Sequence, residues 1–123
     1  MPSFDLERQE VRALNEHLHN LPTDTNETEW KITNPLGRHA IATGLDLAIN
    51  LEIDGHVGYY CGGMNQEASV IINGHCGTGV AENMMSGSVR VRGNASQCAG
   101  ASGHGGLLVI EGNAGPRCGI SIK

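Results

Sequence analysis

Four cysteines are the residues of this 123-residue chain with the widest range of possible chemistry, from nucleophilic catalysis to metal binding. Cys61, Cys76, Cys98 and Cys118 lie 15, 22 and 20 residues apart, so no CxxC pair is present to hold zinc or to cycle as a dithiol. His75 precedes Cys76, but adjacent residues of a strand point to opposite faces, which disfavours a thiolate–imidazole pair. The pattern favours reduced thiols that act as small apolar residues.

The carboxylates are also too scattered for general acid–base catalysis. Glu67, Glu82 and Glu111 are the only acidic residues after Asp54, and their spacing implies no paired geometry. No glycine-rich phosphate loop, HExxH sequence or GxSxG sequence occurs. We therefore expect no catalytic, cofactor-binding or metal-ligating residue in this chain.

The composition narrows the range of partners. Eight Lys and Arg against 13 Asp and Glu give a net charge of −5, which argues against nucleic acid and anionic membranes. No apolar run reaches the ~18 residues of a membrane span, and the first residues lack the basic and apolar stretches of a signal peptide. We expect a cytoplasmic protein without a membrane or nucleic-acid partner.

A 19-residue repeat carries most of the structural information. Gly55, Gly74, Gly93 and Gly112 are evenly spaced, and each follows a short alternation of aliphatic residues. A unit this short cannot bury a hydrophobic face alone, so successive units must stack, about 4.8 Å apart, as coils of a parallel β-solenoid. Glycine suits the corners, because sharp turns need positive φ and stacked backbones leave no room for a Cβ. The predicted structural turns are Gly55, Gly58, Gly62, Gly74, Gly77, Gly93, Gly100, Gly112, Gly115 and Gly119.

Stacked repeats also predict columns of like side chains. His56 and His75 occupy the same repeat position, as do Asn94 and Asn113, and such a column is more often structural than a metal site. Aromatic residues make up only 3% of the chain, so the core must consist of small and aliphatic side chains.

Two segments depart from this small-residue rule, residues 59–65 and 82–87. Tyr, Met and Asn side chains on glycine-supported loops are common in binding surfaces, and they could equally fill corners of the solenoid. The first interpretation gives these candidates for partner contact or for lining an ammonia or amine passage: Tyr59, Tyr60, Met64, Asn65, Glu82, Asn83, Met84 and Met85.

Residues 1–54 differ in composition from the glycine-rich stretch 55–123, and we expect them to cap the solenoid within one structural domain. The spacing of Val11, Leu14, Leu18 and Leu21 predicts an amphipathic helix over residues 5–20, with Ser3 as its N-cap. Short strands are predicted over 31–33 and 39–43, and a half-buried strand over 47–54.

The glycine pattern of Gly55, Gly58 and Gly62 resembles the GXGXG domain at the C-terminal end of glutamate synthase large subunits. Residues 25–28, 58–61, 79–87 and 105–113 narrow the match to a stand-alone form of that domain. In this form the chain resembles the B subunits of N-methylglutamate synthases (methylamine–glutamate N-methyltransferases). The resemblance covers nearly the whole chain. Members of that family continue through several more coils, so we expect either a product truncated at the C-terminal end or another chain that caps the last coil.

The resemblance implies a right-handed parallel β-helix in a multi-subunit flavoenzyme that converts glutamate and methylamine to N-methylglutamate and ammonia. A glutamine-amidotransferase-like subunit and an FMN-binding synthase-like subunit would carry out the chemistry, with FMN and an iron–sulfur cluster expected in a partner subunit. This chain would bind no cofactor and would act as a scaffold. Two alternatives stay open: the equivalent β-helical subunit of a glutamate synthase or formylmethanofuran dehydrogenase complex, and a free-standing ligand-binding solenoid.

Overall fold

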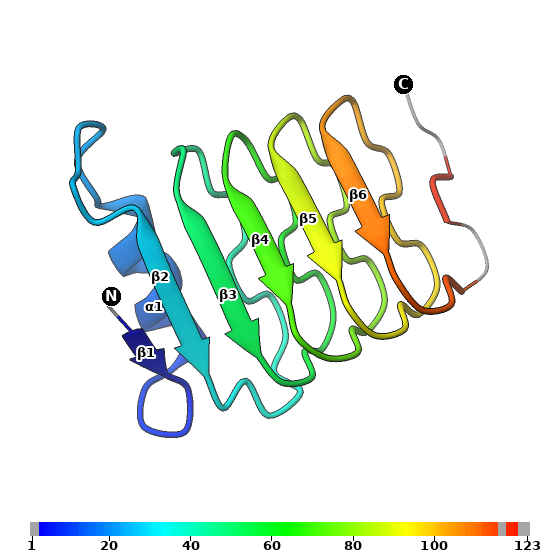
Figure 1. Ribbon diagram of the computed structural model, residues 1–123, viewed down its shortest axis with the longest axis horizontal. Coiled ribbons are helices and arrows are strands. Elements are labelled where there is room, and N and C mark those ends of the chain that lie inside the picture. The colour runs from blue at the N-terminus through cyan, green and yellow to red at the C-terminus, as the bar shows by residue number, and fades with distance from the viewer. Residues whose placement is uncertain (1–2, 116–117, 121–123) are drawn as a thin grey trace.

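The computed structural model describes residues 3–115 and 118–120, and its strands form one six-stranded parallel sheet (Figure 1). Along the chain the elements are β1 (Ser3–Asp5), α1 (Val11–His19), β2 (Glu29–Thr33), β3 (Asn50–Asp54), β4 (Ser69–Ile72), β5 (Ser88–Val91) and β6 (Leu107–Ile110). The strands lie side by side in the order in which they occur in the sequence. The predicted fold class is therefore confirmed: a mainly β, parallel solenoid of about four turns with one short helix.

The hydrogen-bonded register of the sheet reproduces the sequence repeat. Asn50 of β3 pairs with Ser69 of β4, which pairs with Ser88 of β5 and through it with Leu107 of β6, a shift of 19 residues at each step. A second ladder of isolated parallel bridges runs through Val57, Cys76 and Ala95. The glycine spacing therefore measures the length of one coil.

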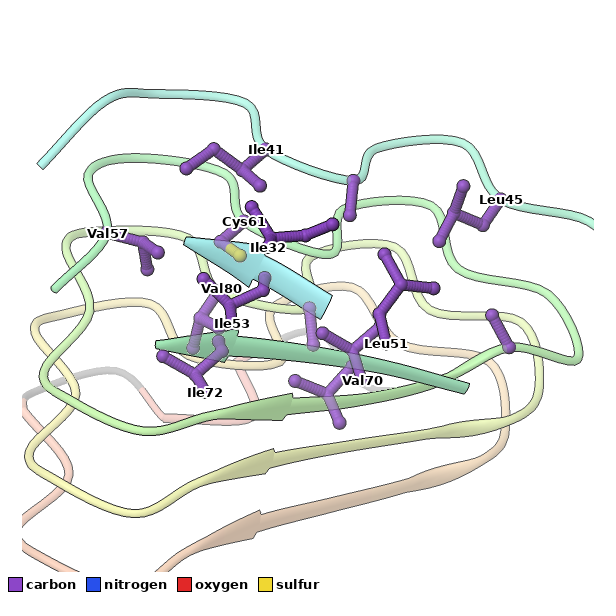
Figure 2. Packing of buried hydrophobic residues seen from close by; sticks show 14 of the residues in the cluster. Ile32, Ile41, Leu45, Leu51, Ile53, Val57, Cys61, Val70, Ile72 and Val80 are labelled. Carbon is purple, nitrogen blue, oxygen red and sulfur yellow. The ribbon is translucent and has the colours of Figure 1, made fainter. Parts of the chain in front are cut away.

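The core lies between the sheet and the return segments of the coils, and it is built mainly from aliphatic side chains (Figure 2). Alternate residues of each strand point inward, so Leu51 and Ile53 of β3 stack on Val70 and Ile72 of β4 with almost no exposed surface. Burial of each such side chain stabilises the fold by about 1.5–3 kcal/mol relative to leaving it exposed. Stacking in parallel brings like side chains into columns, so few aromatic rings are needed to fill the interior.

The N-terminal helix is shorter than its apolar spacing predicts. It begins at Val11 rather than at residue 5 and ends at His19, and its N-cap, Glu10, makes no side-chain capping bond. The prediction of Ser3 as N-cap is wrong, because Ser3 begins β1 and pairs in parallel with Lys31 of β2. Pairing with the sheet outweighs the local helical pattern of this segment.

The strand predicted over residues 39–43 is also wrong. Ala40 and Ala42 have left-handed backbone angles, with φ of 59° and 58°, which cannot continue a strand. The strands predicted over 31–33 and 47–54 are confirmed with shifted starts, since β2 begins at Glu29 and β3 begins only at Asn50. The division of the chain at residue 54 stays a prediction, and the sheet continues across it.

Helix α1 lies behind β2, on the inner side of the sheet (Figure 1). Its Leu14 and Leu18 are buried in the core. Asn15 donates from Nδ2 to the carbonyl of Ala40 at 2.9 Å and accepts at Oδ1 from the N–H of Ala42 at 2.9 Å. The helix thus satisfies backbone groups of the first return segment, as a neighbouring coil does elsewhere in the stack.

Candidate functional site

Between β2 and β6, the return segment of each coil has left-handed residues at every second position. After β3 these residues are Tyr60, Gly62 and Met64, with φ of 62°, 67° and 56°. The next two coils repeat the pattern at Gly79, Ala81 and Asn83, and at Cys98, Gly100 and Ser102. The N–H of Gly62 bonds back to the carbonyl of Ile41 (3.0 Å), and that of Met64 bonds forward to Glu82 (2.7 Å). This alternation ties each coil to both of its neighbours.

Tyr60 and Met64 occupy positions that favour glycine. A left-handed conformation costs an ordinary residue about 1–2 kcal/mol. One neighbouring coil places glycine at each position, Gly79 for Tyr60 and Gly44 for Met64, whereas the other has the left-handed residues Ala40 and Asn83 there. Both side chains are about half exposed, 50% for Tyr60 and 56% for Met64, so burial offsets little of that cost. The left-handed conformation thus belongs to the return segments in general, and Tyr60 and Met64 differ from their equivalents in carrying large, exposed side chains.

Tyr60 and Glu82 meet on this surface from two adjacent coils. The phenol of Tyr60 donates a long hydrogen bond of 3.5 Å from Oη to Oε1 of Glu82. A Cβ on Gly79 would lie 2.8 Å from Oε2 of Glu82 and 3.7 Å from Cδ1 of Tyr60. A Cβ on Gly63 would lie 3.5 Å from the same ring atom. Gly79 therefore lets the carboxylate of Glu82 lie close to the main chain, whereas the distances to the Tyr60 ring are ordinary van der Waals contacts.

Tyr59 is held separately, by His39, a histidine that no motif or repeat spacing of the sequence marks. The rings of His39 and Tyr59 stack with centroids 4.4 Å apart, and Nδ1 of His39 accepts the N–H of Tyr59 at 2.8 Å. Gly58 makes room for this contact, because a Cβ there would collide with His39. The coil from β2 to β3 is longer than the coils that follow it, with Glu29 and its partner Asn50 separated by 21 residues. His39 therefore does not fall on the 19-residue spacing that relates the later coils to one another.

The structure places six of the eight candidate residues at the surface and two in the interior. Tyr59, Tyr60, Met64 and Met85 are exposed, and Glu82 and Asn83 are partly exposed; we call these six residues the contact surface. Asn65 is fully buried, and its Nδ2 donates to the carbonyls of Ala68 at 2.8 Å and of Ser86 at 3.2 Å. Met84 belongs to the core, with 4% of its surface exposed. Neither Asn65 nor Met84 lies on the outer surface with the six other residues, so the contact surface excludes both.

A second column of side chains runs along the corner that follows each strand. Nδ1 of His56 accepts the N–H of His75 at 2.8 Å, and Nδ1 of His75 accepts the N–H of Asn94 at 2.7 Å. Oδ1 of Asn94 continues the column by accepting the N–H of Asn113 at 2.8 Å. The two imidazoles stack with centroids 4.8 Å apart and 7° between their planes, which confirms the predicted histidine column.

This bonding favours the structural interpretation of the histidine column over a metal site. A neutral imidazole whose Nδ1 accepts a hydrogen bond carries its proton on Nε2, so neither nitrogen keeps a free lone pair for a metal. Within residues 3–115 and 118–120, no three His, Cys, Asp or Glu side chains lie close enough together to hold one metal ion. In that part of the chain no helix is both long and apolar enough to cross a lipid bilayer.

The two interior cysteines are placed as structural residues. Burial raises the pKa of the Cys61 thiol well above its ordinary value, and it raises the pKa of Cys76 to about 11. Both thiols stay protonated at neutral pH, so neither can act as a thiolate nucleophile. Cys98 is partly exposed and Cys118 is exposed.

A hollow of about 430 Å³ lies between the last described coils. Its wall is formed by glycines and by apolar side chains that include Met84, Leu107 and Leu108, together with His104 and Cys118. None of the described residues that line it is Lys, Arg, Asp or Glu, and their apolar side chains could accept an apolar group.

The chain is similar to Protein GlxC of Rhizobium meliloti (strain 1021), with 51% identity over 73 residues. These residues make up 59% of this chain and 32% of GlxC, so the matched stretch spans about a third of that relative's length. No protein-family model matches the chain, and no solved structure matches it. More than half of this chain is therefore similar in sequence to part of Protein GlxC.

Proposed function

We propose that this chain is a non-catalytic scaffold subunit of a glutamate-synthase-related complex, and specifically of an N-methylglutamate synthase. Such a complex converts glutamate and methylamine to N-methylglutamate and ammonia. The reactions would take place in a glutamine-amidotransferase-like subunit and an FMN-binding synthase-like subunit, where FMN and an iron–sulfur cluster would be bound. We place the complex in the cytoplasm.

The observation that carries this proposal is the stack of 19-residue coils with glycine at its corners. The resemblance of the glycine pattern to the GXGXG domain implies this architecture for a subunit of a glutamate-synthase-related enzyme. The similarity to Protein GlxC, over 59% of the chain, supports a shared repeat rather than a chance pattern. A solenoid suits a scaffold because each coil adds about 4.8 Å of rigid length to the stack.

The contact surface is the part of the chain that we assign to the flavin-bearing partner. Exposed Tyr and Met side chains are enriched at the centres of protein interfaces. The left-handed backbones of Tyr60 and Met64 are a cost that contact with a partner would offset.

A passage for ammonia or an amine would have to run over the outside of this subunit. Core side chains such as Ile53 and Ile72 are fully buried and fill the space between sheet and return segments. A passage would therefore form between the contact surface and the partner, and residues such as Met64 would line one of its walls.

Native purification through a tag on this chain tests the proposal. We expect amidotransferase-like and flavin-bearing proteins to co-elute in fixed ratio, with the absorbance of FMN, and the complex to form N-methylglutamate from glutamate and methylamine. Co-elution of a tungsten or molybdenum enzyme would contradict the assignment in favour of formylmethanofuran dehydrogenase. Elution of the chain alone, without flavin, would contradict the scaffold role in favour of a ligand-binding solenoid.

Variants of the contact surface then connect the surface to turnover. Tyr60→Ala, Glu82→Ala and Met85→Ala should weaken the complex and lower its turnover while the subunit stays folded. Arg12→Ala is the matched control, because the Arg12 side chain is 85% exposed on α1. Turnover that stays at the wild-type rate in all three surface variants would contradict the assigned contacts.

A further inference from the structure

We propose that Tyr60, Gly79 and Glu82 form a docking site for an arginine side chain of a partner protein. This inference rests on the proposed scaffold role, since it concerns the surface through which the chain would hold that partner. The residues come from two adjacent coils, so the site exists only when the solenoid is folded.

The site places an aromatic face beside a carboxylate. The Tyr60 residue is 50% exposed, and its Oη lies 3.5 Å from Oε1 of Glu82. Gly79 lies beneath both groups, because a Cβ there would come within 2.8 Å of Oε2 of Glu82 and 3.8 Å of Cε1 of Tyr60. Ring and carboxylate are thus held side by side over a stretch of main chain that has no side chain of its own.

The carboxylate of Glu82 lacks a cationic partner among the residues that the structure describes. The ion pairs found there involve the carboxylates of Asp5, Glu16, Asp54 and Glu111. Glu82 is partly buried, and a partly desolvated carboxylate gains more from a nearby cation than a fully hydrated one does. The site therefore favours a positively charged group.

Arginine fits this pair of groups better than lysine does. A guanidinium is planar, so it can stack on the Tyr60 ring while its N–H groups donate to the carboxylate oxygens of Glu82. A lysine ammonium is a compact, strongly hydrated charge with no flat face to stack. The left-handed backbone of Tyr60, with φ of 62°, is shared with Ala40, Gly79 and Cys98 at the same position of other coils. It is therefore a feature of the return segments, and the aromatic ring is what distinguishes this coil.

An NMR titration of the full chain with N-acetyl-arginine amide tests the site. We expect saturable shifts of the Gly79 backbone N–H and of the Tyr60 ring protons. The neutral analogue N-acetyl-citrulline amide should leave these signals in place, and the lysine analogue should bind about fivefold more weakly. No response to the arginine probe, an equal response to citrulline, or equal affinity for lysine would each overturn the proposal.

Two variants and a control locate the response. Glu82→Gln keeps the shape of the side chain and removes its charge, and Tyr60→Leu removes the ring but keeps apolar bulk. Each should weaken arginine binding about fivefold. Glu16→Gln removes an exposed carboxylate from α1 and should leave binding unchanged. Full affinity in Glu82→Gln, with the rest of the spectrum unchanged, would overturn the site.

The titration and the purification fail in different ways. Partners that co-elute with the tagged chain while the arginine probe fails to bind would reject the docking site and leave the scaffold role in place. Arginine binding by a chain that co-elutes with no partner would reject the scaffold role instead.

Discussion

Nδ1 of His56 accepts a hydrogen bond from the backbone N–H of His75 at 2.8 Å, and the two rings lie nearly parallel with centroids 4.8 Å apart. A side chain of one coil thus pairs with the main chain of the next, in place of a backbone carbonyl. Gly74 permits this approach, because a Cβ there would lie 2.9 Å from Nδ1 of His56. Asn94 makes the same bond with its amide oxygen, so the position requires an acceptor at a fixed reach rather than an imidazole.

The requirement for an acceptor predicts different outcomes for two substitutions of His56. His56→Asn should keep the stability of the wild type, because an amide oxygen can accept the N–H of His75. His56→Leu should lower the free energy of unfolding by about 1 kcal/mol, since that N–H then loses its partner. Urea unfolding midpoints measure both effects. An equal loss in the two variants would show that the acceptor is not what stabilises this corner.

Close stacking of the coils predicts that replacement of Gly93 destabilises the fold. A Cβ on Gly93 would lie 2.5 Å from Nδ1 of His75 and 2.7 Å from the carbonyl oxygen of Gly74. Gly93→Ala should therefore lower the free energy of unfolding by about 1–3 kcal/mol. Gly37 is the matched control: its φ is +69°, but a Cβ there meets nothing within 4 Å.

Gly37→Ala has only the left-handed conformation to overcome, so it should cost about 1 kcal/mol. Thermal or chemical unfolding of both variants compares the cost of contact between coils with the cost of the left-handed backbone. A loss in Gly37→Ala as large as that in Gly93→Ala would indicate that backbone conformation, rather than contact between coils, explains the glycine repeat.

The repeat could be predicted from the sequence because hydrogen bonding between coils forces each position to recur at a fixed interval. The segment before β2 does not repeat at this interval, so its structure could not be predicted in the same way. The spacing of Val11, Leu14 and Leu18 marks one face of a helix but does not show where the helix begins, and the pairing of Ser3 with β2 is a long-range contact. The left-handed conformation of Ala42 could not be predicted either, because alanine gives no sign of it. Later coils have glycine at the equivalent position, Gly62 and Gly100.

The candidate site could be predicted only in outline. Departure from small residues identified Tyr60 and Glu82, which do meet at the surface. Asn65 and Met84 belong to the same two segments but point inward. The return segments alternate between left-handed residues and others, and they follow neither the period of a strand nor that of a helix. Sequence spacing therefore does not show which of their side chains face the core.

Asp54 predicts a dependence of stability on pH. A hydrogen bond of 2.8 Å from Nδ2 of Asn73 holds the pKa of Asp54 below its ordinary value, and Lys31, 3.1 Å away, acts in the same direction. A carboxylate whose pKa is lower in the folded state stabilises the fold above its unfolded pKa, about 3.9, and loses that contribution as the pH falls through the folded value.

Asp54→Asn should therefore be less stable than the wild type at neutral pH, by less than about 1 kcal/mol because the pair is solvent-exposed. The difference should shrink as the pH is lowered below about 4. Unfolding midpoints at a series of pH values measure it, with Asp24→Asn as the control, since Asp24 makes no ion pair among the described residues. A difference that is constant with pH would contradict the role of the Asp54 carboxylate.

Met64 predicts opposite effects on stability and on partner binding. Its left-handed φ of 56° is unfavourable for methionine and accessible to glycine, and its side chain is 56% exposed. Met64→Gly should therefore raise the free energy of unfolding by about 0.5–1 kcal/mol. Met64→Ala keeps the unfavourable backbone and should bring no gain. Both variants remove the side chain from the contact surface, so both should co-elute with less of the flavin-bearing partner. A Met64→Gly chain less stable than the wild type would show that the side chain serves the fold itself.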